Sequence, residues 1–257
     1  MPLPTPIRLQ GCAAFLLAAA TALAQPATNG IFAVRAQQAF TRAQAEFAAH
    51  PGEATNALAL GRTSYDLAEL ATNNEQRATV SQAGIAACHQ LLLREPKSAP
   101  AHYYLAMDCG ELAEAEAPSM AAYRLIHDIE REFKTAAELD ERFDQAGPAR
   151  CLGLLYRDAP GWPISIGSKH KAHEYLDHAA ALAPDFPENQ INLVESQILW
   201  HQAAEAETAW RKLATLWPAA RTNFTGVAWE SSWDDWTKRR AAAKADFQKA
   251  FKRPPEP

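Results

Sequence analysis

Small, bulky and proline residues follow one another in a fixed order in the middle of the chain. The clearest instance contains, in order, Leu152-Gly153, Tyr156, Ala172, Leu176, Ala179 and Pro184. A small residue lets two helices approach closely, bulky residues fill the space to the next pair of helices, and a proline ends a helix. The pattern therefore predicts a helical hairpin. One hairpin cannot bury its apolar face alone, so we expect several stacked copies.

Three further copies of this pattern can be aligned along the chain. The four predicted units span 54–98, 99–145, 146–186 and 187–220. The last is the most regular, with Leu193-Val194 at the small-residue position, Pro218 as the closing proline and the ~34-residue length of helical-hairpin repeats. Earlier copies lie around Leu60-Gly61 and Leu105-Ala106. The first three units are longer, and we expect their extra residues to lie between the two helices.

This order of residues resembles that of the tetratricopeptide (TPR) repeat, which is a helix, a turn and a second antiparallel helix. The resemblance implies an all-α fold, in which residues 54–220 form a short right-handed TPR-like αα-hairpin solenoid of about four repeats. Such a solenoid is one domain despite its length, because each hairpin packs on its neighbours.

A packing helix is expected on the amino-terminal side of the repeats, within residues 25–53. Between Gly30 and about Ala49, apolar residues recur at three- and four-residue steps, and Pro51-Gly52 ends the run. The stripe consists of Phe32, Ala36, Phe40, Ala43 and Phe47. Asn29 is a suitable residue to cap the first turn of this helix.

A second stripe lies in residues 221–257 and predicts a capping helix followed by a tail. It consists of Trp229, Trp233, Trp236, Ala243, Phe247 and Phe251, while Lys238, Arg239, Arg240 and Lys244 lie off it. We expect this helix to cover the apolar end of the last repeat. The alternative is an aromatic patch that binds a partner. The final residues, Pro254 to Pro257, are expected to be frayed.

The first 24 residues have the features of an export signal. Arg8 precedes an apolar run from Cys12 to Leu23, and Ala22 and Ala24 provide the small residues of a cleavage site. The run is too short to span a bilayer, for which about 20 residues are needed. We expect cleavage after Ala24 and a periplasmic or secreted protein with no membrane span in the mature chain.

The charge of the chain argues against nucleic acid as a partner. The sequence has 25 basic and 30 acidic residues and a net charge of −5, and loss of Arg8 with the signal makes the mature chain more acidic.

Cys88, Cys109 and Cys151 remain after cleavage. Cys88 and Cys109 either form a disulfide between neighbouring helices or are buried free thiols.

Catalytic motifs are weak in this sequence. His173-Glu174 followed by His178 is one residue longer than the zinc-protease helix motif, which places the two histidines about 140° apart around a helix. His170, His173, Glu174 and Asp177 do share a face, but we interpret it as a solvated polar face rather than a metal site. There is no phosphate-binding glycine loop and no nucleophile elbow. We therefore predict no catalytic residue, metal or cofactor.

Residues 147–195 have a more particular pattern than a generic repeat. Its elements are the segments 147–153 and 159–163, Gly167 and the Ala-Leu-Ala-Pro ending at Pro184. They resemble the T-component (TatT) family associated with TRAP-type substrate transporters. The resemblance implies a periplasmic, non-catalytic protein built of TPR-like hairpins, with a ligand cleft or pore. It further implies cooperation with a periplasmic solute-binding protein and leaves homo-oligomerisation open.

The first helix of each repeat is expected to line a concave groove that binds a ligand or partner. The candidate groove residues are Arg62, Tyr65, Tyr103, Met107, Arg150, Leu154, Arg157, Asn192 and Glu195. Three arginines among aromatic residues suit an anionic ligand or a peptide carboxylate, because a guanidinium is a planar two-pronged donor. Alternatively, the arginines form structural ion pairs with Glu195, Asp66 or Asp158.

The Ala159–Gly167 insertion is the last candidate element. We expect Ile164 to pack into the stack, whereas Trp162 either packs or forms a rim over the groove. The leading functional prediction is a non-enzymatic binding or scaffold protein similar to the transporter accessory family. The alternative is an envelope scaffold that holds proteins together without a role in transport, and an enzyme is a distant third.

Overall fold

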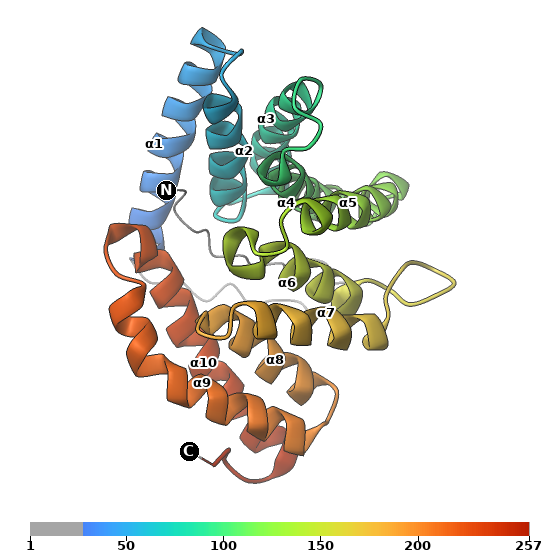
Figure 1. Cartoon of the computed structure of the whole chain (residues 1–257), viewed down its shortest axis with the longest axis vertical. Helices are drawn as coiled ribbons and strands as arrows, with labels where there is room; N and C mark the ends of the chain where they lie inside the picture. The colour runs from blue at the N-terminus through green and yellow to red at the C-terminus, as the bar shows by residue number, and fades with distance from the viewer. Residues whose placement is uncertain (1–27, 257) are drawn as a thin grey trace. The chain divides into compact units, whose positions relative to one another are not determined.

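The structure, a computed structural model, describes residues 28–256 and is all-helical over that range, with no β-strand (Figure 1). The helices are α1 (Thr28–Ala49), α2 (Ala54–Ala68), α3 (Asn74–Leu92), α4 (Ala99–Glu116), α5 (Met120–Leu139), α6 (Phe143–Asp158), α7 (Lys169–Leu182), α8 (Pro187–Leu199), α9 (Ala203–Asn223), the 3-10 helix η2 (Val227–Trp229) and α10 (Glu230–Phe251). Helices pack in adjacent pairs, such as α2 with α3, α4 with α5 and α8 with α9. The predicted all-α class is confirmed, and the predicted export signal lies outside the described residues.

The described helices form two compact units. One contains α1 to α5, up to Phe143, together with the loop 158–168. The other contains residues 144–157 of α6 and α7 to α10. Each unit has buried residues of its own, because the helices within it pack face to face.

The core of the α1–α5 unit includes the predicted apolar stripe of α1. Phe40 and Ala43 are buried, and Ala36 and Phe47 are partly buried against residues of α2 and α3 such as Leu60. The helix begins at Thr28 rather than at Gly30. The stripe follows the 3.6-residue period, so one face of α1 is apolar and the other is exposed.

Two glycines allow the helices of this unit to approach closely. A Cβ atom on Gly61 would lie 2.6 Å from Cys88 Sγ, and one on Gly84 would lie 2.1 Å from Asp108 Oδ2. No larger side chain fits at either position unless these neighbours move. Cys88 and Cys109 are free, buried thiols, which corresponds to the second of the two alternatives for this pair.

The helix boundaries show where the extra residues of the longer predicted units lie. In the second predicted repeat, residues 99–145, the extra residues lengthen α4 and α5, which are joined by the short turn 117–119. Ser119 caps the start of α5, and its hydroxyl accepts a hydrogen bond from the backbone N–H of Ala122 at 3.1 Å. The expectation of a long connection is wrong there, whereas α6 and α7 are separated by the loop 159–168.

In the α6–α10 unit, α6 and α7 meet at the predicted small residue. A Cβ atom on Gly153 would lie 2.6 Å from Leu176 Cγ. The predicted end of α9 is wrong, because the helix continues through Pro218 to Asn223. A proline removes one backbone hydrogen bond but its fixed φ is compatible with a helix, and packing can maintain the helix beyond it.

The carboxy-terminal helix α10 packs on α8. Trp229 and Trp236 of the predicted stripe are buried and contact Phe186 and Phe224 edge to face. This aromatic cluster favours a packing role for the stripe over a free binding patch.

The carboxy-terminal tail is not frayed, in contrast to the sequence prediction. Arg253 donates to both carboxylate oxygens of Glu207, at 2.8 and 2.7 Å. The backbone N–H of Glu256 donates to the same carboxylate at 3.1 Å, and the carboxylate of Glu256 pairs with Arg211 at 2.8 Å. These contacts fix the tail against α9, which a proline-rich sequence does not reveal.

Candidate functional site

The residues predicted to line a groove do not form one open surface. Six of them are buried, namely Tyr65, Tyr103, Met107, Arg150, Leu154 and Asn192. Arg62, Arg157 and Glu195 are partly exposed. Arg62 pairs with Asp66 at 3.7 Å, which is one of the ion pairs given as an alternative. The prediction that these side chains are accessible in a groove is therefore wrong for six of the nine residues.

Arg150 has a structural role instead of facing a groove. Its side chain donates to the backbone oxygens of Gln145 and Asp144, to the Asp144 carboxylate at 3.1 Å and to Asn189. These bonds hold a backbone turn in which Asp144, Gln145 and Ala146 have φ values of 49°, 57° and 63°. This left-handed conformation is costly for residues other than glycine and persists only where surrounding contacts enforce it.

Arg239 is buried, although it lies off the apolar stripe of α10. Its guanidinium donates to both carboxylate oxygens of Glu195, at 2.9 and 2.6 Å, and to Asn192. Glu188 and Asp235 lie 3.5 and 3.6 Å away. Burial raises the pKa of Glu188 to about 7, although Arg150 and Arg239 oppose this shift. These groups join α8 to α10 and leave Glu195 occupied within the protein.

The loop between α6 and α7 carries two large exposed apolar side chains. Trp162 is 88% exposed and Ile164 is 69% exposed. The loop is closed at its base, where the N–H of Gly167 donates to the oxygen of Pro160 at 2.9 Å. Trp162 is therefore not packed against the helices, and the expected packing of Ile164 is wrong.

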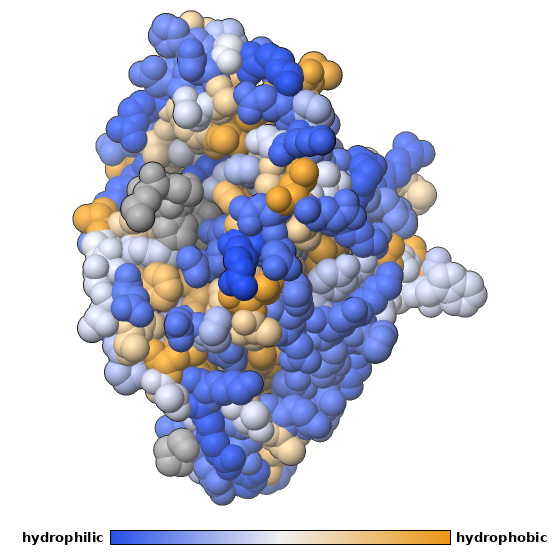
Figure 2. Space-filling view, viewed as in Figure 1, coloured by the Kyte–Doolittle hydropathy of each residue, from blue (hydrophilic) through white to orange (hydrophobic). Residues whose placement is uncertain are grey.

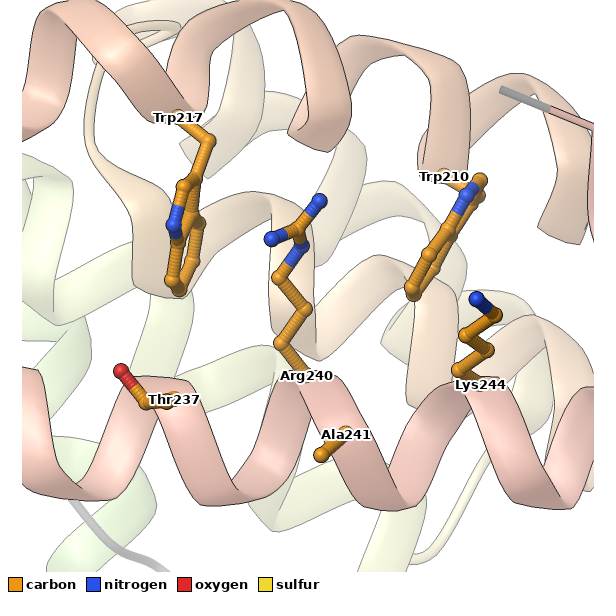
Figure 3. A pocket seen from close by; sticks show the side chains of 6 residues that line it. All are labelled: Trp210, Trp217, Thr237, Arg240, Ala241 and Lys244. Carbon is orange, nitrogen blue, oxygen red and sulfur yellow. The ribbon is translucent and has the colours of Figure 1, made fainter.

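A pocket between α9 and α10 brings together residues that the sequence pattern did not combine (Figure 3). Its volume is about 260 Å³. The lining consists of Trp210 and Trp217 from α9 and of Thr237, Arg240, Ala241 and Lys244 from α10. The first two are seven residues apart and the other four follow three- and four-residue steps, so each set lies on one face of its helix.

Arg240 stands between the two indoles of the pocket. Its guanidinium carbon lies 4.6 Å from the ring centroid of Trp217 and 5.5 Å from that of Trp210. Figure 3 shows the guanidinium between the rings and Lys244 extending from α10 toward Trp210. Both distances allow a cation–π interaction.

The charges of Arg240 and Lys244 have no acidic partner within residues 28–256, and Arg240 Nε is buried without a hydrogen-bond partner there. Other cations of the same two helices are paired, such as Lys238 with Asp234 and Arg211 with Glu256. Partial burial lowers the pKa of Arg240 from its ordinary value. The pocket therefore contains two cationic side chains that are available to bind an anion.

A third cation, Arg221, contacts the aromatic residues that form the Trp217 wall of the pocket. Arg221 lies over the ring of Trp233 at 3.9 Å and donates to Thr237 at 3.1 Å. Trp233 in turn meets Trp217 edge to face, with 5.2 Å between ring centroids. These contacts hold one wall of the pocket in place before any ligand arrives.

The histidine face of α7 does not assemble a metal site. His173 lies on Trp200, with 4.0 Å between ring centroids, and one of its ring nitrogens is 2.9 Å from Gln202 Oε1. Within the described residues, no group of three or more histidine, cysteine or acidic side chains could hold a metal ion. No helix of that part of the chain has the length and hydropathy needed to cross a membrane.

Hydrophilic residues cover most of the face shown in Figure 2, with apolar residues in small groups between them. Comparison with protein-family models gives no match to this chain, and a search of curated proteins gives none either.

The pocket itself could have been suspected from the sequence. Trp210 and Trp217 are seven residues apart, and Arg240 and Lys244 are one helical turn apart outside the apolar stripe.

Proposed function

We propose that this chain is a non-enzymatic binding protein that holds an anionic ligand, or an acidic group of a partner protein, in the pocket between α9 and α10. One observation carries the proposal: Arg240 and Lys244 line a cavity with aromatic walls, and no acidic side chain of the described residues neutralises them. A charge-assisted hydrogen bond to such a cation contributes about 1.5–3 kcal/mol.

The wider setting of the proposal rests on the sequence. TPR-like hairpins, an export signal and the resemblance to the T-component family favour a periplasmic accessory protein that cooperates with a solute-binding protein. Adjacent packing of the helices is compatible with this arrangement. The presence of this pocket favours ligand binding over the alternative of an envelope scaffold, which would need an extended contact surface rather than a cavity.

Native mass spectrometry of protein purified from its own cells tests this function directly. We expect a bound organic anion or an acidic partner, which is lost in the double variant Arg240→Gln, Lys244→Gln. Lys249→Gln is a matched control, because Lys249 is an exposed cation on α10 outside the pocket. Equal binding by the double variant and the control would place the functional surface elsewhere. Chemical turnover of the bound anion would favour an enzyme.

A further inference from the structure

The walls of the α9–α10 pocket are suited to a flat ring. Trp210 and Trp217 present indoles on either side of Arg240, and Ala241 contributes only a methyl group. The guanidinium carbon lies 5.5 Å from the ring centroid of Trp210 and 4.6 Å from that of Trp217, so Arg240 is closer to Trp217. Aromatic rings interact at centroid distances of 4.5–7 Å, in stacked or edge-to-face arrangements.

The cations of the pocket are placed for a single anionic group. Arg240 and Lys244 are four residues apart on α10, so their side chains start about 5–6 Å from each other. The guanidinium of Arg240 and the ammonium group of Lys244 can therefore reach the same carboxylate. The next cation, Arg221, is engaged with Thr237 and with the ring of Trp233. A ligand with a second carboxylate would have to place it against an indole wall.

The size of the cavity limits the ligand further. A volume of about 260 Å³ is below the range of about 300–1,000 Å³ that is typical of sites for drug-sized ligands. A nucleotide or an oligosaccharide would extend far outside it. An inorganic anion would satisfy the two cations but would make no ring contact with either indole.

We propose that the ligand of this pocket is a small aromatic monocarboxylate, whose ring stacks against Trp210 and whose carboxylate lies between Arg240 and Lys244. This inference rests on the proposed function and adds to it the chemical class of the anion. The fork of Arg240 supplies two parallel donors to the carboxylate, and Lys244 supplies a third charge-assisted bond.

Calorimetric titration of the full mature chain with four small probes tests the inference. Benzoate is the expected ligand, cyclohexanecarboxylate has a ring without aromatic character, benzamide has the ring without the charge, and succinate has two carboxylates without a ring. We expect benzoate to bind about 2- to 10-fold more tightly than cyclohexanecarboxylate, because an aromatic contact is lost. Benzamide should bind about 10-fold or more weakly than benzoate, because charge-assisted bonds are lost.

Single substitutions show which residue is responsible for the preference for a carboxylate and which for the preference for an aromatic ring. Arg240→Gln should weaken the binding of benzoate by about 10-fold or more and leave the binding of benzamide unchanged. Lys249→Gln should change the affinity for neither probe. Trp210→Leu should abolish the preference for benzoate over cyclohexanecarboxylate while carboxylate binding persists. Since Trp210 is buried and its loss can disturb folding, quenching of tryptophan fluorescence by benzoate in the unmodified chain gives a second readout.

The outcomes separate this inference from the proposed function. Tighter binding of succinate or inorganic phosphate than of benzoate, with loss in Arg240→Gln, would overturn the aromatic class and leave an anion-binding protein. An absence of binding for every anion would overturn both. Benzoate binding that survives both Arg240→Gln and Trp210→Leu would show that the ligand occupies another site.

Discussion

At the residue scale, Asp108 is held in an unusual environment. It is fully buried, and neither of its carboxyl oxygens has a hydrogen-bond partner within residues 28–256. Burial raises the pKa of Asp108 well above its ordinary value, and Glu111 and Asp66 raise it further. Burial likewise raises the pKa of Glu111 to about 8, against the opposing effect of Arg77. Both acids therefore keep their protons to a higher pH in the folded protein than an exposed carboxyl group does.

This protonation makes the stability of the α1–α5 unit depend on pH. An acid with a raised pKa binds its proton more tightly in the folded state than in the unfolded chain, whose carboxyl pKa is about 4. Its contribution to stability is complete below pH ~4 and is lost as pH rises toward the folded-state value. We expect the free energy of unfolding to fall from pH ~4 toward pH ~8, where Glu111 titrates in the folded protein, and to fall less steeply in Asp108→Asn. Urea denaturation followed by circular dichroism at several pH values measures both slopes. Glu95→Gln, an exposed acid, is the control, and equal slopes in all three proteins would contradict this account.

Arg150 gives a second prediction at this scale. Removing one partner of a buried ion pair costs about 3–5 kcal/mol, so Arg150→Gln should greatly destabilise the α6–α10 unit. The neighbouring Arg157 is partly exposed, and Arg157→Gln should change stability by about 1 kcal/mol or less. Chemical denaturation monitored by tryptophan fluorescence compares the two variants. A small effect of Arg150→Gln would show that the left-handed turn at Asp144–Ala146 does not depend on this side chain.

The sequence could place Arg150 on a helix but not inside the protein. Its spacing from Leu152-Gly153 is that of a groove position in a regular repeat, and this was the basis of the prediction. What buries it is the turn at Asp144–Ala146, whose backbone oxygens it binds. Of these three residues only Asp144 is of a type that occasionally adopts the left-handed conformation, which is otherwise found mainly at glycine and asparagine, so the sequence gives little local sign of this turn.

At the scale of elements, the pattern of small and bulky residues was a good guide to helices and a poorer guide to their ends. Helices begin at Ala54, Ala99 and Pro187, where three of the predicted units begin. Proline was less reliable, because Pro218 lies inside α9. The tail beyond α10 is held by Glu207, a contact between residues more than forty positions apart that local patterns do not report.

Gly153 tests the register of the α6–α7 pair. Gly153→Ala places a methyl group against Leu176 and should destabilise the protein by about 1–3 kcal/mol through overpacking. Gly30→Ala is the matched control, because no atom lies within 4 Å of a Cβ at that exposed helical position. The control should be neutral or more stable by up to about 1 kcal/mol. Urea midpoints compare the two, and an unchanged midpoint for Gly153→Ala would contradict the close contact.

At the scale of the whole molecule, the sequence predicted one continuous stack, and the described helices instead form two compact units. Repeat patterns predict contacts between neighbouring hairpins but not where such contacts become sparse. The pocket between α9 and α10 belongs to one of these units, since all six lining residues come from these two helices. Export of the chain stays a prediction, and sequencing of the mature amino terminus should give Gln25.

The distribution of tryptophan allows the two units to be followed separately. Six of the seven tryptophans lie in the α6–α10 unit, and the remaining one, Trp162, lies on an exposed loop. Fluorescence therefore reports mainly on α6–α10, whereas circular dichroism reports on all helices. Because each unit has its own buried core, we expect the two probes to give transitions that do not coincide.

Substitutions make this last prediction specific. At pH 8, Asp108→Asn should move the transition seen by circular dichroism and leave the fluorescence midpoint in place, because Asp108 lies in the α1–α5 unit. Arg150→Gln should instead lower the fluorescence midpoint, because it loosens the unit that holds the tryptophans. If either substitution moved both midpoints by the same amount, the two units would unfold as one cooperative structure. The boundary near Phe143 would then divide contacts but not stability, and the pocket between α9 and α10 would depend on every helix of the chain.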